Sequence, residues 1–210
     1  MKKDVMIVTG AGQISMAIAR RTGFGKKIVL GDKNMDNCNA IAKTMADAGF
    51  DVKPFQMDLS SRESILAMID KALGYGEIKY MVNGAGVSPS QAPIEAILKV
   101  DLYGTAVLLE EVGKVIAEGG AGITISSQSG WRMPQLSPEE DRQLANGPRG
   151  DFYKNMFAKC PAGRPGTADE MATIAEFLLS DAASFVTGST FLADGGATAS
   201  YYYGSLQPEK

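Results

Sequence analysis

The sequence contains no histidine among its 210 residues, and this absence removes several common kinds of active site. Without imidazole there is no Ser-His-Asp triad, no Cys-His pair and no histidine ligand for a metal ion. The two cysteines, Cys38 and Cys160, are too few for a disulfide framework or a thiolate zinc site. We therefore expect two free thiols and no metal centre.

Long apolar runs and a strong excess of one charge are also missing. No run reaches the length of a membrane-spanning helix, and residues 1–8 do not have the pattern of a signal peptide. A balance of 21 basic against 24 acidic residues gives no basic surface for nucleic acid. We expect a cytoplasmic protein that binds neither membrane nor nucleic acid. Its hydrophobic content of 45% predicts one domain over residues 1–210.

Short apolar runs alternate with segments of helical spacing along the chain. Continuous apolar runs are typical of strands buried in a parallel sheet. The alternation predicts an α/β fold: a Rossmann-type, doubly wound parallel sheet in a three-layer α/β/α arrangement. The expected strands are 5–8, 28–30, 52–57, 78–82, 123–125 and 191–193, and the expected helices are 14–21, 35–48, 60–73, 94–117 and 168–179.

A glycine turn joins the first expected strand to the first helix, in the run Thr9-Gly10-Ala11-Gly12-Gln13-Ile14-Ser15. The first glycine permits a tight turn, and the second lets the backbone approach a pyrophosphate at the helix N-terminus. Ser15 stands in place of the usual third glycine and is small enough for close packing of helix and strand. This position favours dinucleotide binding over a plain tight turn.

Asp32 follows the second expected strand, about 20 residues after the glycine turn. An acid at this distance accepts hydrogen bonds from the ribose of a bound adenosine, whereas the alternative is a solvated loop charge. A carboxylate would repel a 2′-phosphate, which favours NAD over NADP. Lys33 could pair with that phosphate, so NADP stays open as the cofactor.

Several motifs, in order along the expected elements, resemble the short-chain dehydrogenase/reductase family. They are Thr9-Gly10-Ala11-Gly12, Asn83-Gly84-Ala85-Gly86, Ile125-Ser126-Ser127, Gly163-Arg164-Pro165-Gly166, Phe185-Val186-Thr187-Gly188 and Asp194-Gly195-Gly196. The resemblance runs from residue 4 to about 130 and from about 147 to 198. It implies an NAD(P)-dependent oxidoreductase that transfers hydride between nicotinamide and a secondary alcohol or ketone.

The resemblance also implies a cofactor site and one catalytic side chain. Ser127 would hydrogen-bond the carbonyl or hydroxyl oxygen of a small-molecule substrate. The cofactor residues would be Gly10, Gly12, Gln13 and Ile14 at the pyrophosphate, Asp32 at the ribose, Asp58 and Leu59 beside the adenine, and Asn83, Ala85 and Gly86 along the cleft.

Two further features bear on this resemblance. Asp101 stands where the family usually has an asparagine tied into a proton relay, so we do not count it as catalytic. Family members are commonly homo-tetramers or homo-dimers, and the run Tyr201-Tyr202-Tyr203 is either a subunit contact or a frayed tail.

The family's acid/base pair, a tyrosine and a lysine four residues apart, is missing from its expected place. Residues 128–150 contain neither type, and the sixth parallel strand is also absent. The spacing recurs at Tyr75 and Lys79, which we reject because that stretch runs into a strand. We favour the interpretation that this sequence omits roughly 25 residues or more of the protein between residues 145 and 146, over a chain that is truly short. The alternative is a non-catalytic dinucleotide-binding or scaffold protein.

Overall fold

The computed structural model describes residues 3–89, 91–127 and 158–206. The chain divides into two compact units. The first comprises residues 1–125 and 168–187, and the second comprises residues 126–167 and 188–210. The single domain expected over residues 1–210 stays a prediction.

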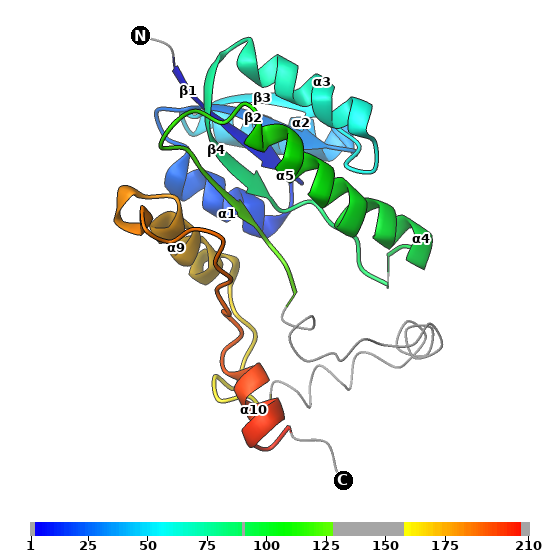
Figure 1. Cartoon of the computed structure of the whole chain (residues 1–210), viewed down its shortest axis with the longest axis vertical. Helices are drawn as coiled ribbons and strands as arrows, with labels where there is room; N and C mark the ends of the chain where they lie inside the picture. The colour runs from blue at the N-terminus through cyan, green and yellow to red at the C-terminus, as the bar shows by residue number, and fades with distance from the viewer. Residues whose placement is uncertain (1–2, 90, 128–157, 207–210) are drawn as a thin grey trace. The chain divides into compact units, whose positions relative to one another are not determined.

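The first unit is built on a parallel sheet of five strands in the order β3-β2-β1-β4-β5 (Figure 1). The chain adds β2 and β3 on one side of β1 and then crosses over to add β4 and β5 on the other side. The direction of winding therefore reverses between β1 and β4, whose carboxyl ends meet at one edge. The strands are β1 (Lys3–Thr9), β2 (Lys27–Asp32), β3 (Asp51–Gln56), β4 (Gly76–Asn83) and β5 (Ala121–Thr124).

Helices cover both faces of this sheet, which confirms the predicted three-layer α/β/α fold. One face carries α1 (Gln13–Thr22), α2 (Met35–Asp47) and α9 (Ala168–Leu178), which share a core that includes Ile18, Ala42 and Ala172. The other carries α3 (Arg62–Leu73) and α5 (Thr105–Gly113), which pack through Ile65 and Leu108. The short α4 (Ile94–Ile97) and the π-helix η1 (Leu98–Gly104) lead into α5.

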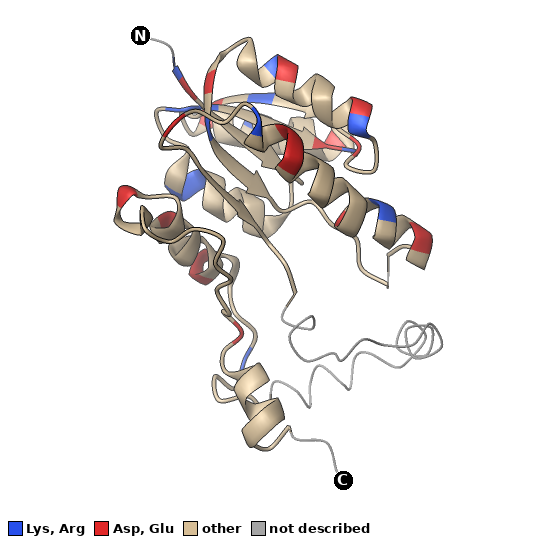
Figure 2. Cartoon of the chain, viewed as in Figure 1, with Lys and Arg blue, Asp and Glu red and all other residues tan. Residues whose placement is uncertain are grey.

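Side-chain capping and ion pairs fix the helices at their ends and edges. Asn34 caps α2 by accepting the N–H of Asn37, because the first amides of a helix lack partners within it. Arg21 of α1 binds the Asp169 carboxylate of α9 through two nitrogens, at 3.0 and 2.7 Å. Charged residues also lie along α3 and α5 (Figure 2), where Arg62 pairs with Glu110 at 2.7 Å. These contacts join α1 to α9 and α3 to α5.

The described part of the second unit contains α10 (Ala197–Tyr203) and no strand. The strand expected at 191–193 is therefore wrong. A strand exists only beside a partner, and the described sheet ends at β5. Asp194 instead caps α10 by accepting the N–H groups of Gly196 at 3.0 Å and Thr198 at 2.7 Å.

The helix expected over 94–117 is interrupted, because η1 separates α4 from α5 and α5 ends at Gly113. No helix in the described ranges is both long and apolar enough to cross a bilayer.

Gly104, at the end of η1, is buried where the helix passes the backbone that follows β3. A Cβ at Gly104 would lie 2.1 Å from the carbonyl oxygen of Leu59, whereas one at Gly113 would meet no atom within 4 Å. We predict that Gly104→Ala lowers the free energy of unfolding by about 1–3 kcal/mol through overpacking. Gly113→Ala should raise it by about 0.4–1 kcal/mol, because alanine restricts the unfolded chain.

Urea unfolding of both variants beside the wild-type protein provides the measurement. Equal stability of the two variants would contradict the close approach of η1 to Leu59.

Candidate functional site

The carboxyl ends of β1 and β4 are joined by a buried polar network. Thr9 Oγ1 donates to Asn83 Oδ1 at 2.6 Å, and Asn83 Nδ2 donates to Thr105 Oγ1 at 3.1 Å. The Ala85 N–H donates to Thr9 Oγ1 at 3.4 Å. Thr9 and Asn83 are almost completely excluded from solvent, at 0% and 1% exposed. The network therefore fixes the start of the loop after β4 against the end of β1.

Gly10 follows Thr9 and can only be glycine in this arrangement. Its φ is 79°, in the left-handed region, and a Cβ would lie 2.8 Å from the backbone of Ala85. Its N–H donates to the carbonyl of Gly31 at 2.8 Å. The turn is thus held between β2 on one side and the loop after β4 on the other.

Gly12 is the N-cap of α1 and faces open space. A Cβ there would meet no atom within 4 Å, and no side chain caps the helix at this residue. The first turn of α1 carries no acidic residue. Gln13 is exposed and Ile14 half-buried. The unpartnered amides and the positive end of the helix dipole make this opening suited to an anionic group.

Asp32 connects the end of β2 to the glycine turn. Its carboxylate accepts the Ala11 N–H at 2.7 Å and the Asn34 N–H at 2.8 Å. Each carboxylate oxygen has two lone pairs, so the half-buried group keeps acceptor capacity for a ligand hydroxyl. Asp32 is therefore both a support of the turn and an acceptor beside it.

Lys33, which follows Asp32, forms an ion pair with Asp58 at 2.7 Å. Burial alone would raise the pKa of Asp58, but hydrogen bonds from Lys33 and Ser60 outweigh burial and lower it. Leu59 is buried beside this pair, at 4% exposed. The lysine that could have met a 2′-phosphate is thus already engaged with a carboxylate.

On the far side of the turn, η1 contacts the loop after β4. The Val87 N–H donates to Asp101 Oδ1 at 3.0 Å. A Cβ on the exposed Gly86 would lie 3.2 Å from the same oxygen, so glycine lets the carboxylate approach the backbone. Interruptions of this π-helical kind often occur at functional sites.

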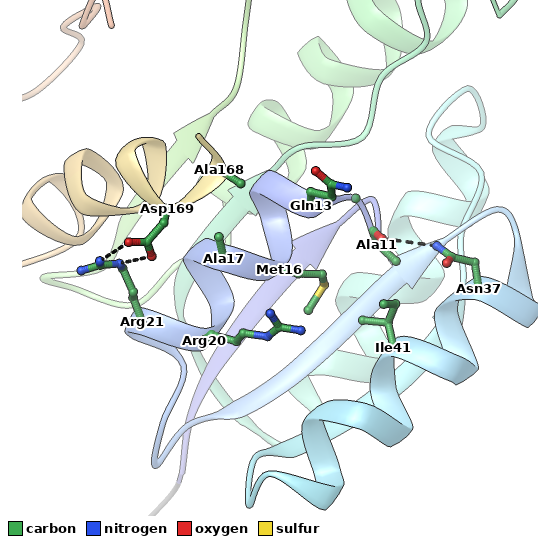
Figure 3. A pocket seen from close by; sticks show the side chains of 11 residues that line it. Ala11, Gln13, Met16, Ala17, Arg20, Arg21, Asn37, Ile41, Ala168 and Asp169 are labelled. Atoms are coloured by element: carbon green, nitrogen blue, oxygen red, sulfur yellow. Dashed lines mark hydrogen bonds and ion pairs between the residues drawn. The ribbon is translucent and has the colours of Figure 1, made fainter. Parts of the chain in front are cut away.

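A pocket of about 600 Å³ opens beside the glycine turn, between α1, α2 and the start of α9 (Figure 3). Met16 and Ile41 are apolar residues of its lining, and Gln13, Arg20 and Asn37 are polar ones. The Asn37 side chain donates to the Ala11 carbonyl at 3.3 Å. The space beside Gly12 therefore extends outward along the α1 surface.

The structure brings together all ten residues that the sequence assigned to a cofactor, on the loops and helix ends at the carboxyl edge of β1 to β4. Ser127 is exposed and belongs to the second unit. The catalytic role of Ser127 and the cofactor-binding roles of these ten residues stay predictions. The junction between residues 145 and 146 and the expected place of the acid/base pair, residues 128–150, lie outside the described residues. Lys79 lies within β4, which confirms that Tyr75 and Lys79 do not share a helix face.

Sequence reasoning missed three contacts at this site: Thr9 with Asn83, Asp32 with Ala11, and Asp101 with Val87. A signal existed for the first, because Thr9 is a polar residue that continues an apolar run and precedes the glycine turn. The other two join side chains to backbone amides, for which a sequence gives no pattern.

Comparison with known proteins identifies the family. A family model described as short chain dehydrogenase matches residues 4–137, and one described as Enoyl-(Acyl carrier protein) reductase matches residues 141–198. The chain belongs to the short-chain dehydrogenase/reductase family. Its relatives are named dehydrogenases and reductases, which supports an oxidoreductase.

Its relatives include a short-chain dehydrogenase/reductase, bsc3, from Alternaria brassicicola, 28% identical over 95% of this chain and 97% of the relative. D-threitol dehydrogenase from Mycolicibacterium smegmatis is 30% identical over 92% of each chain. These matches extend over 266 and 244 residues, more than the 210 of this chain. Each relative therefore contains residues without a counterpart here.

Solved structures of short-chain dehydrogenases/reductases share the fold. One from Brucella melitensis has a TM-score of 0.75 at 22% identity, covering 92% of this chain and 96% of its own. One from Serratia marcescens has a TM-score of 0.77 at 21% identity, covering 93% and 98%.

The Thr9 hydroxyl is tested by replacing it with an apolar group of the same shape. We predict that Thr9→Val lowers the free energy of unfolding by about 1–3 kcal/mol, because the buried Asn83 oxygen loses its donor. Thr44→Val provides the control, since Thr44 Oγ1 bonds only within the exposed face of α2, and should change stability by less than about 0.5 kcal/mol. Chemical denaturation provides the measurement, and a neutral Thr9→Val would contradict the network.

Proposed function

We propose that this short-chain dehydrogenase/reductase binds NAD at the glycine turn and transfers hydride between nicotinamide and a secondary alcohol or ketone. The observation that carries the proposal is the open α1 N-terminus at Gly12, with the Asp32 carboxylate anchored beside it. The two features fit the pyrophosphate and the ribose of one dinucleotide. Members of this family generally use NAD or NADP.

NAD is favoured over NADP by the charges around the ribose position. Asp32 would repel a 2′-phosphate, and Lys33, the neighbouring cation, is paired with Asp58 at 2.7 Å. The Asp58 and Leu59 segment would lie beside the adenine, and Asn83, Ala85 and Gly86 would line the opposite half of the cleft. We therefore expect NADP to bind more weakly than NAD.

The reaction divides between the cofactor and the chain. The nicotinamide supplies hydride transfer at its C4 atom when bound. This chain's residues hold the dinucleotide across β1, and Ser127 would donate a hydrogen bond to the substrate oxygen. The reaction also moves a proton to or from the substrate oxygen. No acid/base pair is assigned to the residues present, so in this chain the proton would be exchanged with solvent water.

The relatives support an alcohol or ketone of low molecular mass as the substrate. Their names include D-threitol dehydrogenase, cis-4-hydroxycyclohexanecarboxylate dehydrogenase and 3beta-hydroxysteroid dehydrogenase. All three names refer to hydroxyl-bearing compounds. We further propose that the protein is cytoplasmic and forms a homo-tetramer or homo-dimer.

Cofactor binding is tested at Gly12, where a side chain is sterically free but would fill the space needed by a pyrophosphate. Gly12→Ser keeps a good N-cap residue, so we predict a melting temperature close to that of the wild-type protein. Its affinity for NADH, measured by fluorescence titration, should fall at least about tenfold, because the side chain blocks the approach of phosphate to the helix.

Gly25→Ser is the control, since Gly25 lies in a remote turn with open space around it. Because Gly25 has a φ of 77°, a serine there should lower the free energy of unfolding. The affinity of the Gly25→Ser variant for NADH should be unchanged. Unchanged NADH affinity in Gly12→Ser would contradict binding at this turn.

Turnover is tested by following nicotinamide absorbance with a panel of secondary alcohols and ketones. We predict measurable hydride transfer that Ser127→Ala lowers by at least about tenfold, because the substrate oxygen loses a donor. NADH binding by the wild-type protein without turnover on any substrate would favour a dinucleotide-binding protein without catalysis. The missing tyrosine and lysine motivate this non-catalytic alternative.

A further inference from the structure

Asp101 places a carboxylate against the loop after β4. Its Oδ1 accepts the Val87 N–H at 3.0 Å, and the exposed Gly86 leaves room for this approach. Asp101 itself is half-buried in η1, where it is held by the π-helical backbone. Within residues 3–89, 91–127 and 158–206, no lysine or arginine forms an ion pair with it. Within these described ranges, its negative charge therefore has no cation paired with it.

The sheet determines which half of a dinucleotide would approach Asp101. A dinucleotide crosses the carboxyl edge where the winding reverses, here between β1 and β4. Asp32 ends β2 and Asp58 follows β3, on the side where the adenosine half would lie. The other half, which carries the nicotinamide, would extend over the end of β4 and the Gly86–Val87 loop that Asp101 supports.

The two redox forms of the nicotinamide differ in charge at this end of the site. The oxidised ring carries a positive charge, and the reduced ring is neutral, whereas the adenosine and pyrophosphate are the same in both. A fixed negative charge near the ring attracts only the oxidised form. Contacts to the adenosine and the pyrophosphate affect both forms equally, because these parts are identical in the two.

We propose that Asp101 is a positioning residue that fixes the Gly86–Val87 loop and makes the site favour the oxidised coenzyme over the reduced one. This inference rests on the proposed function. It differs from a role in proton transfer, because it requires only the charge of the carboxylate and the Val87 hydrogen bond. An amide at the same position would keep the hydrogen bond and lose the charge.

The test is the ratio of the dissociation constants of NAD⁺ and NADH, measured by calorimetric titration of the whole chain. Asp101→Asn retains an acceptor for Val87, so its melting temperature should stay near that of the wild-type protein. We expect it to weaken NAD⁺ binding relative to NADH binding by roughly fivefold, the size of a partly screened charge interaction. Asp70→Asn, an equal change of charge on the exposed face of α3, should leave the ratio unchanged.

Salt provides a second measurement on the wild-type protein itself. Raising the ionic strength screens the interaction of Asp101 with the ring, so the preference for NAD⁺ over NADH should narrow. If Asp101→Asn leaves the ratio of the NAD⁺ and NADH dissociation constants unchanged, or weakens both affinities equally, the inference is overturned. NADH binding by the wild-type protein would still uphold the dinucleotide site in that case. Failure of the wild-type protein to bind either coenzyme overturns the proposed function and this inference with it.

Discussion

The hydrogen bond between Thr9 and Asn83 is the contact on which the candidate site depends. It joins the ends of β1 and β4 at the point where the sheet reverses its direction of winding. Strand ends at such a point splay apart and leave a crevice, so the loops that follow need a fixed origin. The same Thr9 hydroxyl accepts the Ala85 N–H, and this contact sets where the loop after β4 begins.

Close packing around the hydrogen bond between Thr9 and Asn83 imposes a second constraint on the site. Gly10 has no room for a Cβ against Ala85, and a Cβ on Gly84 would overlap the Ser15 hydroxyl. Each small residue brings one loop nearer to the next, so the turn can pass between β2 and β4. Only Gly12 in this turn faces open space, and that difference separates a glycine required by packing from one that leaves room for a ligand.

Much of the fold of the first 125 residues could be predicted, because buried parallel strands and flanking helices have distinct apolar patterns. The run at 5–8 lies within β1 and is fully buried. The strand at 191–193 was wrong, since its apolar pattern is local whereas a strand needs a neighbour. The η1 interruption and the Asp101 contact with Val87 depend on backbone geometry that residue types do not encode.

The residues proposed to bind the cofactor and the place expected for the acid/base pair lie in separate parts of the chain. The residues assigned to the cofactor run from Gly10 to Gly86 within the first unit, and the hydrogen bonds of Thr9, Asp32 and Asp101 that fix their loops are made inside that unit. The tyrosine and lysine of the family are expected within residues 128–150, which follow β5 in the sequence. The contacts of the glycine turn do not involve those residues and so do not depend on whether the acid/base pair is present. Loss of an acid/base pair would therefore leave the proposed dinucleotide site intact, whereas the proposed hydride transfer needs the bound dinucleotide and would be lost with it.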